Sequence, residues 1–148
     1  MTTRKKINRL EKLRHIKDRL KEEAKVRVSD QRQKEALLEK QTEVLETRLE
    51  KNISLFRERS SGGIITPDEL WCLRSDIDSI EEEIRIIGEA MEKTRREMDI
   101  LQEDLISKNR ETRLTEALLE VHKCERRREI IDSEQKELDD LVCMKFSK

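Results

Sequence analysis

The chain has 148 residues, of which 45% are Asp, Glu, Lys or Arg and only 2% are aromatic, and its formal net charge is −1. Because a typical globular domain contains about 25% charged residues, this composition indicates long exposed helices without a large core. The sequence has no glycine-rich phosphate loop, no Ser-His-Asp pattern and no apolar run of about 18 residues. It therefore predicts a cytoplasmic protein that is not an enzyme, needs no cofactor and does not insert into a membrane.

The first predicted helix runs from about residue 3 to residue 59. Along it, apolar residues recur at short helical spacings: Ile7, Leu10, Leu13, Ile16, Leu20, Ala24, Val28, Leu38, Leu45, Leu49 and Phe56. Polar residues interrupt this stripe at four positions: Gln31, Glu35, Thr42 and Asn52. Polar residues in such a stripe weaken helix pairing but help to fix its register. The pattern predicts an amphipathic helix that packs against another helix.

Residues 60–66 form the predicted turn. Gly62 and Gly63 suit the left-handed conformation that often ends a helix. Thr66, Pro67 and Glu69 then match a capping box with proline at the first helical position. A second helix therefore begins at Pro67, and we expect it to end near residue 145.

The second helix opens with the most regular pattern in the chain. Eleven positions follow one another in alternating steps of three and four residues, and all but one are apolar: Leu70, Leu73, Ile77, Ile80, Ile84, Ile87, Met91, Thr94, Met98, Leu101 and Leu105. Such a heptad seam is typical of a left-handed coiled coil. Because a short turn makes two long helices antiparallel neighbours, the predicted fold is an all-α antiparallel coiled-coil hairpin, a single domain over residues 1–148.

In this hairpin, residue i faces roughly residue 127 − i, which places Ile7 near Glu120 and Phe56 near Trp71. The polar stretch 107–113 interrupts the heptads. Beyond it, apolar residues return in another register: Leu114, Ala117, Leu118, Val121, Cys124, Ile131, Leu138 and Val142. We therefore predict a local shift of the seam, followed by a C-terminal segment that extends beyond the first helix from about residue 125.

Charge is unevenly distributed along the chain. Residues 1–34 contain 13 Lys or Arg and 5 Asp or Glu, whereas residues 66–105 contain 5 and 13. The two segments either form solvated helix faces that attract each other, or the basic segment meets an acidic partner. Nothing in the sequence resembles a nucleic-acid-binding module, because a base-reading motif and interleaved aromatic residues are both missing.

Trp71, the one tryptophan, lies just beyond the turn, close in sequence to Ile64 and Ile65. Two interpretations fit this cluster. It either forms a small apolar plug that closes the hairpin, or it is exposed and docks a partner, as aromatic residues within polar surroundings often do.

The remaining candidate residues are three arginines, two histidines and three cysteines. Arg126, Arg127 and Arg128 either form a solvated face or contact another protein. His15 and His122 are predicted to be solvent-exposed, because no cysteine or carboxylate cluster completes a metal site. The three cysteines are widely spaced and predict free thiols in a reducing compartment.

In length, layout and pattern the chain resembles the FliJ/YscO family, the central-stalk proteins of flagellar and injectisome type III secretion ATPases. The resemblance is carried by the basic amphipathic start 4–14, the segment 55–59 and the turn 62–71, where a tryptophan precedes an Ile-rich heptad. It implies a hairpin similar to the coiled coil of the gamma subunit in rotary ATP synthases. The overall pattern favours the injectisome branch.

The resemblance also implies two interfaces. The paired termini would enter the pore of the hexameric export ATPase, with contacts from Arg4, Lys5, Lys6, Arg9, Arg126, Arg127 and Arg128. The turn would bind the cytoplasmic domain of the membrane export gate. Flagellar members carry an aromatic residue further along the second helix, where this chain has Ser75 and Asp76, so the expected gate contacts are Ile64, Ile65, Leu70, Trp71, Leu73 and Ile77.

Some family members bind chaperones of late secretion substrates, which implies chaperones as further partners. Because the heptads of the hairpin pair within one chain, we expect the protein to be a monomer. Two other functions fit the same composition: a generic coiled-coil scaffold, whose heptads pair between chains, and a helical chaperone of secretion substrates, which needs an exposed apolar groove and a tight dimer.

Overall fold

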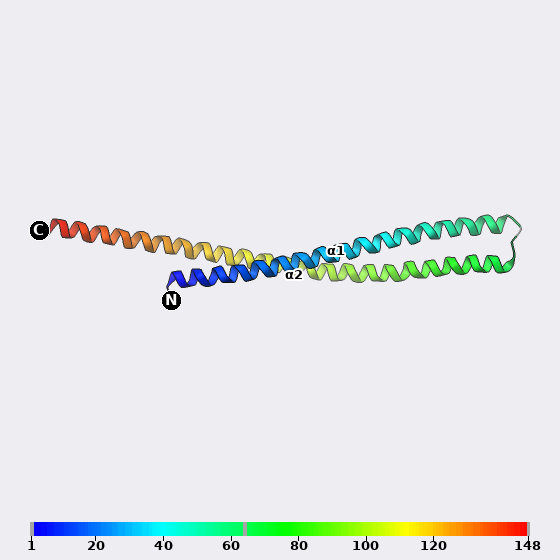
Figure 1. Ribbon diagram of the computed structural model, residues 1–148, viewed down its shortest axis with the longest axis horizontal. Helices are drawn as coiled ribbons and strands as arrows, with labels where there is room; N and C mark the ends of the chain where they lie inside the picture. The colour runs from blue at the N-terminus through cyan, green and yellow to red at the C-terminus, as the bar shows by residue number, and fades with distance from the viewer. Residues whose placement is uncertain (1, 64, 148) are drawn as a thin grey trace. The chain divides into compact units, whose positions relative to one another are not determined.

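The computed structural model describes residues 2–63 and 65–147. Two helices account for nearly all of them: α1, Thr3–Ser61, and α2, Pro67–Phe146 (Figure 1). No strand occurs in these residues, which confirms the predicted all-α hairpin. None of the described helices carries an apolar stretch long enough to cross a bilayer.

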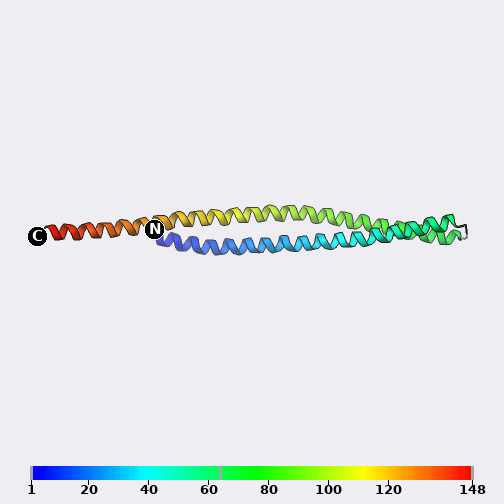
Figure 2. The same cartoon turned by 90° about the horizontal axis from the view of Figure 1, so that it is seen from above.

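The chain divides into two compact units, which we call the turn unit (residues 26–103) and the terminal unit (residues 1–25 with 104–148). Each unit contains a stretch of α1 beside a stretch of α2, as the two views of Figures 1 and 2 show. Each unit is therefore a pair of antiparallel helices with its own interhelical seam.

In the turn unit the seam is where the heptads predict it. Every one of the eleven predicted positions of α2 is buried or half-buried, and all of them except Leu105 belong to the turn unit. The buried side chains on this part of α1 are Val28, Gln31 and Leu45. Apolar side chains at alternating steps of three and four residues form one stripe along a helix, so two such stripes bury each other.

The turn begins and ends through local hydrogen bonds. The Gly62 backbone N–H donates to the Glu58 carbonyl at 3.0 Å, and Gly63 has a positive φ of 72°, which a side chain would disfavour. The Glu69 N–H donates to Thr66 Oγ1 at 3.3 Å and caps the start of α2. The predicted turn residue Ile64 lies outside the described residues.

In the terminal unit the predicted shift of the seam is wrong. The heptad steps of α2 continue past Leu105 without interruption. The buried and half-buried positions that continue the heptads of α2 are Leu105, Lys108, Thr112, Thr115, Leu119, His122 and Arg126. Those that continue the heptads of α1 are Thr3, Ile7, Leu10, Arg14, Lys17, Lys21 and Ala24. We call these the terminal seam positions.

The continuous register has a simple physical reason. Thr112 and Thr115 donate their hydroxyl protons to the carbonyls of Lys108 and Glu111, one turn earlier in the same helix. Their polar atoms are therefore satisfied within α2, and their methyl groups can face α1. An unbroken helix cannot change the face it presents without extra residues in its repeat, so Leu114 and Leu118 stay exposed.

Candidate partner-binding surfaces

The predicted gate-binding residues do not form one exposed surface. Leu70 and Leu73 are half-buried seam residues, and Ile77 is only 2% exposed. Ile77 packs in the seam, so its prediction as a partner contact is wrong. Trp71 follows a seam position and is 71% exposed, which contradicts a buried apolar plug. Ile65 is half-buried.

A surface cavity of about 340 Å³ lies between the helices near the turn. It is lined by Leu55, Arg59, Asp68, Glu69, Cys72, Leu73 and Asp76. Sequence reasoning missed most of these residues because the lining comes from both helices, and each contributes only scattered positions. The charged lining contains three carboxylates and one guanidinium, so the cavity carries a negative charge beside an apolar floor.

One polar contact fixes how the helices pair in the turn unit. The buried Gln31 side chain donates through Nε2 to the Thr94 carbonyl at 3.0 Å and to Glu97 Oε2 at 3.1 Å. A buried amide needs such partners, and Gln31 has both in this register. Gln31 therefore helps to set the level at which α1 meets α2.

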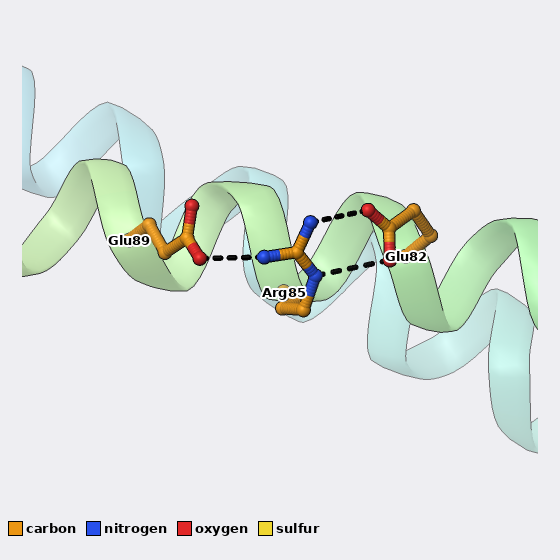
Figure 3. A network of polar contacts seen from close by, with 3 residues as sticks. All are labelled: Glu82, Arg85 and Glu89. Atoms are coloured by element: carbon orange, nitrogen blue, oxygen red, sulfur yellow. Dashed lines mark hydrogen bonds and ion pairs between the residues drawn. The ribbon is translucent and has the colours of Figure 1, made fainter.

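An exposed charge network lies on the outer side of α2 in the turn unit (Figure 3). Arg85 donates to both Glu82 and Glu89 within the same helix. The hydrogen bond from Arg85 lowers the pKa of Glu82, and the two carboxylates raise the pKa of Arg85. These contacts stabilise the helix locally and bring no residue from α1 into a site.

Four basic residues near the start of α1 form no salt bridge with any other described residue. Arg4, Lys5, Lys6 and Arg9 are exposed, and none has an ion-pair partner within residues 2–63 and 65–147. Their charges are therefore available to a partner.

The three arginines of the cluster Arg126, Arg127 and Arg128 on α2 differ in their ion-pair partners. Arg127 donates to Glu120 Oε1 at 3.0 Å, and Arg126 lies 3.8 Å from Glu129. Arg128 is exposed and has no ion pair within the described chain. Of the three arginines, Arg128 therefore has the least compensated charge.

The structure brings the start of α1 to this cluster. Ile7, Glu120, Lys123, Arg126 and Arg127 line one cavity of about 390 Å³, which confirms that Ile7 lies opposite Glu120. Thr3 Oγ1 also donates to Glu129 Oε1 at 2.6 Å. The two predicted groups of basic residues therefore belong to one region of the terminal unit.

The described histidines and cysteines form no metal site. His15 is exposed, whereas His122 is half-buried and lies 3.1 Å from Glu125 Oε2, which corrects its predicted full exposure. No group of three potential metal ligands occurs in the described residues. Cys72, Cys124 and Cys143 are all free and exposed.

Residues 5–148 match the family described as flagellar FliJ protein. The chain belongs to the FliJ family. Neither a curated protein nor a solved structure matches it. FliJ family membership makes the chain a component of the flagellar and type III export machinery, and the predicted family resemblance is confirmed over almost the whole chain.

Proposed function

We propose that this FliJ family chain is a non-enzymatic stalk of a type III protein export apparatus on its cytoplasmic side, where it links the hexameric export ATPase to the membrane export gate. The family match over residues 5–148 carries this proposal. The matched family is described as flagellar, so it does not favour the injectisome branch that the sequence pattern suggested.

The ATPase contacts are proposed for the terminal unit. Arg4, Lys5, Lys6 and Arg9 are exposed and have no ion pair in the part of the chain that the structure describes, so binding to an acidic surface breaks no salt bridge seen there. Long-range attraction between opposite charges speeds association and is weakened by salt. Arg128 extends this basic surface on α2.

Binding of the full chain to the cognate ATPase tests this half of the proposal. Reversing the four N-terminal charges to Glu should weaken binding by more than roughly tenfold at low salt. A matched control reverses Arg32, Lys34, Arg48 and Lys51, which are exposed basic residues of α1 in the turn unit. Equal loss with both variants would show a general charge effect and would contradict a specific site.

The gate contacts are proposed for the surface around the turn. Trp71 presents a large exposed aromatic side chain, and the nearby cavity offers apolar and acidic groups from both helices. Trp71→Ala should reduce capture by the cytoplasmic domain of the export gate. Ile86→Ala is the matched control, because Ile86 is also an exposed apolar residue of α2 in the same unit. Unchanged capture by Trp71→Ala would contradict this assignment.

Binding to secretion chaperones is a further part of the proposal. Capture of the full chain by a purified secretion chaperone, in place of the gate domain, tests it. A generic coiled-coil scaffold is the alternative function. That alternative predicts no selective capture of the ATPase or of the gate domain, so the two binding experiments separate it from the export stalk.

A further inference from the structure

The terminal unit has two faces that differ in chemistry. In an antiparallel pair, residues just before the seam positions of both helices lie on one side, and residues just after them lie on the other. We call these the leading and the trailing face. Glu11 and Lys123 each follow a terminal seam position, and their side chains meet at 4.0 Å, as this geometry requires.

The leading face is apolar, whereas the trailing face is polar. On the leading face five aliphatic side chains are exposed: Leu13, Ile16, Leu114, Leu118 and Val121. At matching levels the trailing face carries Glu11, His15, Asp18, Arg113, Glu116, Glu120 and Lys123. Exposed apolar side chains shared by two neighbouring helices are the surface that an amphipathic third helix covers.

The charged residues beside the apolar side chains restrict what this third helix can be. Lys6 and Arg9 of α1 and Arg128 of α2 occupy the same leading face, toward the termini, together with Glu125, whose carboxylate lies 3.1 Å from His122 Nδ1. None of the three basic residues has an ion pair in the described part of the chain. The complementary helix therefore has an apolar stripe and acidic residues beside it.

The C-terminal part of α2 has this chemistry. Every described residue from Arg127 onward is exposed. Four of its apolar residues lie on one side of the helix, because three of them are three, four or seven residues from Leu138: Ile131, Leu138, Leu141 and Val142. Residues 129–146 contain six acidic residues and two lysines: Glu129, Asp132, Glu134, Glu137, Asp139, Asp140, Lys136 and Lys145.

We propose that the chain forms a symmetric antiparallel dimer, in which the C-terminal segment 129–146 of each copy packs on the leading face of the other. With the two-fold axis beside Glu129 and Ile130, the heptads of the two α2 helices bring matching side chains together. Val121 then lies opposite Leu138 of the second copy, and Leu118 lies opposite Leu141. A two-fold axis makes every such contact occur twice.

The same register aligns the charges. Ile7 shares a cavity with Glu120 and Lys123, so the neighbouring Lys6 and Arg9 lie level with this stretch of α2. In the dimer this level meets residues 136–139 of the second copy, which include Glu137 and Asp139. The basic residues without ion pairs thereby gain acidic partners.

This dimer departs from the monomer that the sequence predicts, because it uses apolar residues that were expected in the seam. Its existence does not depend on the proposed export function. One consequence does rest on that function: the dimer covers Lys6 and Arg9, so ATPase binding and self-association exclude each other.

Light scattering during size-exclusion chromatography of the full chain, without any partner, tests the dimer. We expect a mass that rises with concentration from 17.7 kDa toward twice that value. Leu118→Glu with Leu138→Glu should raise the dimer Kd by more than roughly tenfold, since both residues are exposed in the single chain and central in the dimer. His15→Glu with Arg113→Glu is the trailing-face control and should leave the dimer intact.

Disulfide trapping tests the register. In a chain whose native cysteines are replaced by Ser, Val121→Cys and Leu138→Cys are made separately and then mixed under oxidising conditions. We expect a cross-linked pair in the mixture and little in either chain alone. Glu120→Cys, on the trailing face, replaces Val121→Cys as the control and should not cross-link.

A chain that stays at 17.7 kDa at every concentration would overturn the proposal. So would a dimer that survives the leading-face substitutions or cross-links equally through Glu120→Cys. Circular dichroism of each variant confirms that α1 and α2 are retained. Because no ATPase is present, failure of the export proposal cannot produce these results.

Discussion

Lys17 Nζ lies 2.8 Å from Glu111 Oε2 and joins α1 to α2 within the terminal unit. Lys17 is a terminal seam residue, and Glu111 immediately precedes the seam residue Thr112. The ammonium group lowers the pKa of Glu111 below its ordinary value of 4.5. An acidic group with a lowered pKa in the folded chain stabilises that state when it is ionised.

This contact gives a pH-dependent prediction. The contribution of Glu111 is fully present above the ordinary pKa of 4.5 and is lost as the pH falls through the lower pKa of the folded chain. Glu111→Gln should therefore lower the thermal midpoint at neutral pH, and its difference from the wild type should shrink below pH 4.5. Thermal unfolding followed by circular dichroism at several pH values measures the midpoints of the variant and of the wild type. A difference that persists in acid would show that Glu111 acts through packing.

The turn unit allows a direct comparison of a seam residue with its exposed neighbour. Ile77→Ala should lower the free energy of unfolding by about 2–5 kcal/mol, because it leaves a cavity at a position only 2% exposed. Trp71→Ala should change it by less than about 1 kcal/mol, despite the larger side chain removed. Urea denaturation compares the two variants. A larger loss for Trp71→Ala would mean that the tryptophan packs against the hairpin.

Much of the turn unit could be predicted from the sequence because its apolar residues are regularly spaced and strongly hydrophobic. The positions from Leu70 to Leu105 leave one way to bury the stripe, and Thr66 with Pro67 marks the helix start unambiguously. The exposure of Trp71 also fits this register, because Trp71 lies between Leu70 and Leu73, two seam positions three residues apart, on the side of α2 away from α1.

The terminal unit could not be predicted in the same way because two local signals conflict there. Leu114, Leu118 and Val121 form the more apolar stripe, yet Thr112 and Thr115 continue the register. Sequence inspection weighs local hydrophobicity. It does not show that a threonine hydroxyl satisfied within its own helix can be buried, or that an uninterrupted helix keeps its face.

Of the candidate surfaces, the basic one could be predicted from the sequence and the cavity near the turn could not. Exposure of Arg4, Lys5, Lys6 and Arg9 can be predicted from the sequence, because charged side chains outside the apolar stripe of a helix face water. The cavity near the turn requires knowledge of which α1 residues meet α2, and Leu55 or Asp76 gives no sign of it in isolation.

Gln31 provides a test of the buried polar contact. Gln31→Leu replaces a hydrogen-bonded amide with an apolar side chain of similar size, and the Thr94 carbonyl belongs to the regular hydrogen bonding of α2. We expect the variant to be at least as stable as the wild type, because an apolar residue suits a coiled-coil seam better than an amide. Urea denaturation measures this. A loss above about 1 kcal/mol would show that the hydrogen bonds to Thr94 and Glu97 stabilise the hairpin.

Two adjacent leucines decide the register of the terminal unit. Leu119 is 2% exposed and faces α1, whereas Leu118 is 44% exposed on the leading face. Leu119→Ala should therefore lower the free energy of unfolding by about 2–5 kcal/mol, and Leu118→Ala by less than about 1 kcal/mol. The measurement is made at protein concentrations where the chain is monomeric, so that loss of dimer contacts does not contribute. The shifted seam suggested by local hydrophobicity predicts the reverse order, because it buries Leu118 and exposes Leu119. Equal losses would mean that the terminal helices pair in both registers.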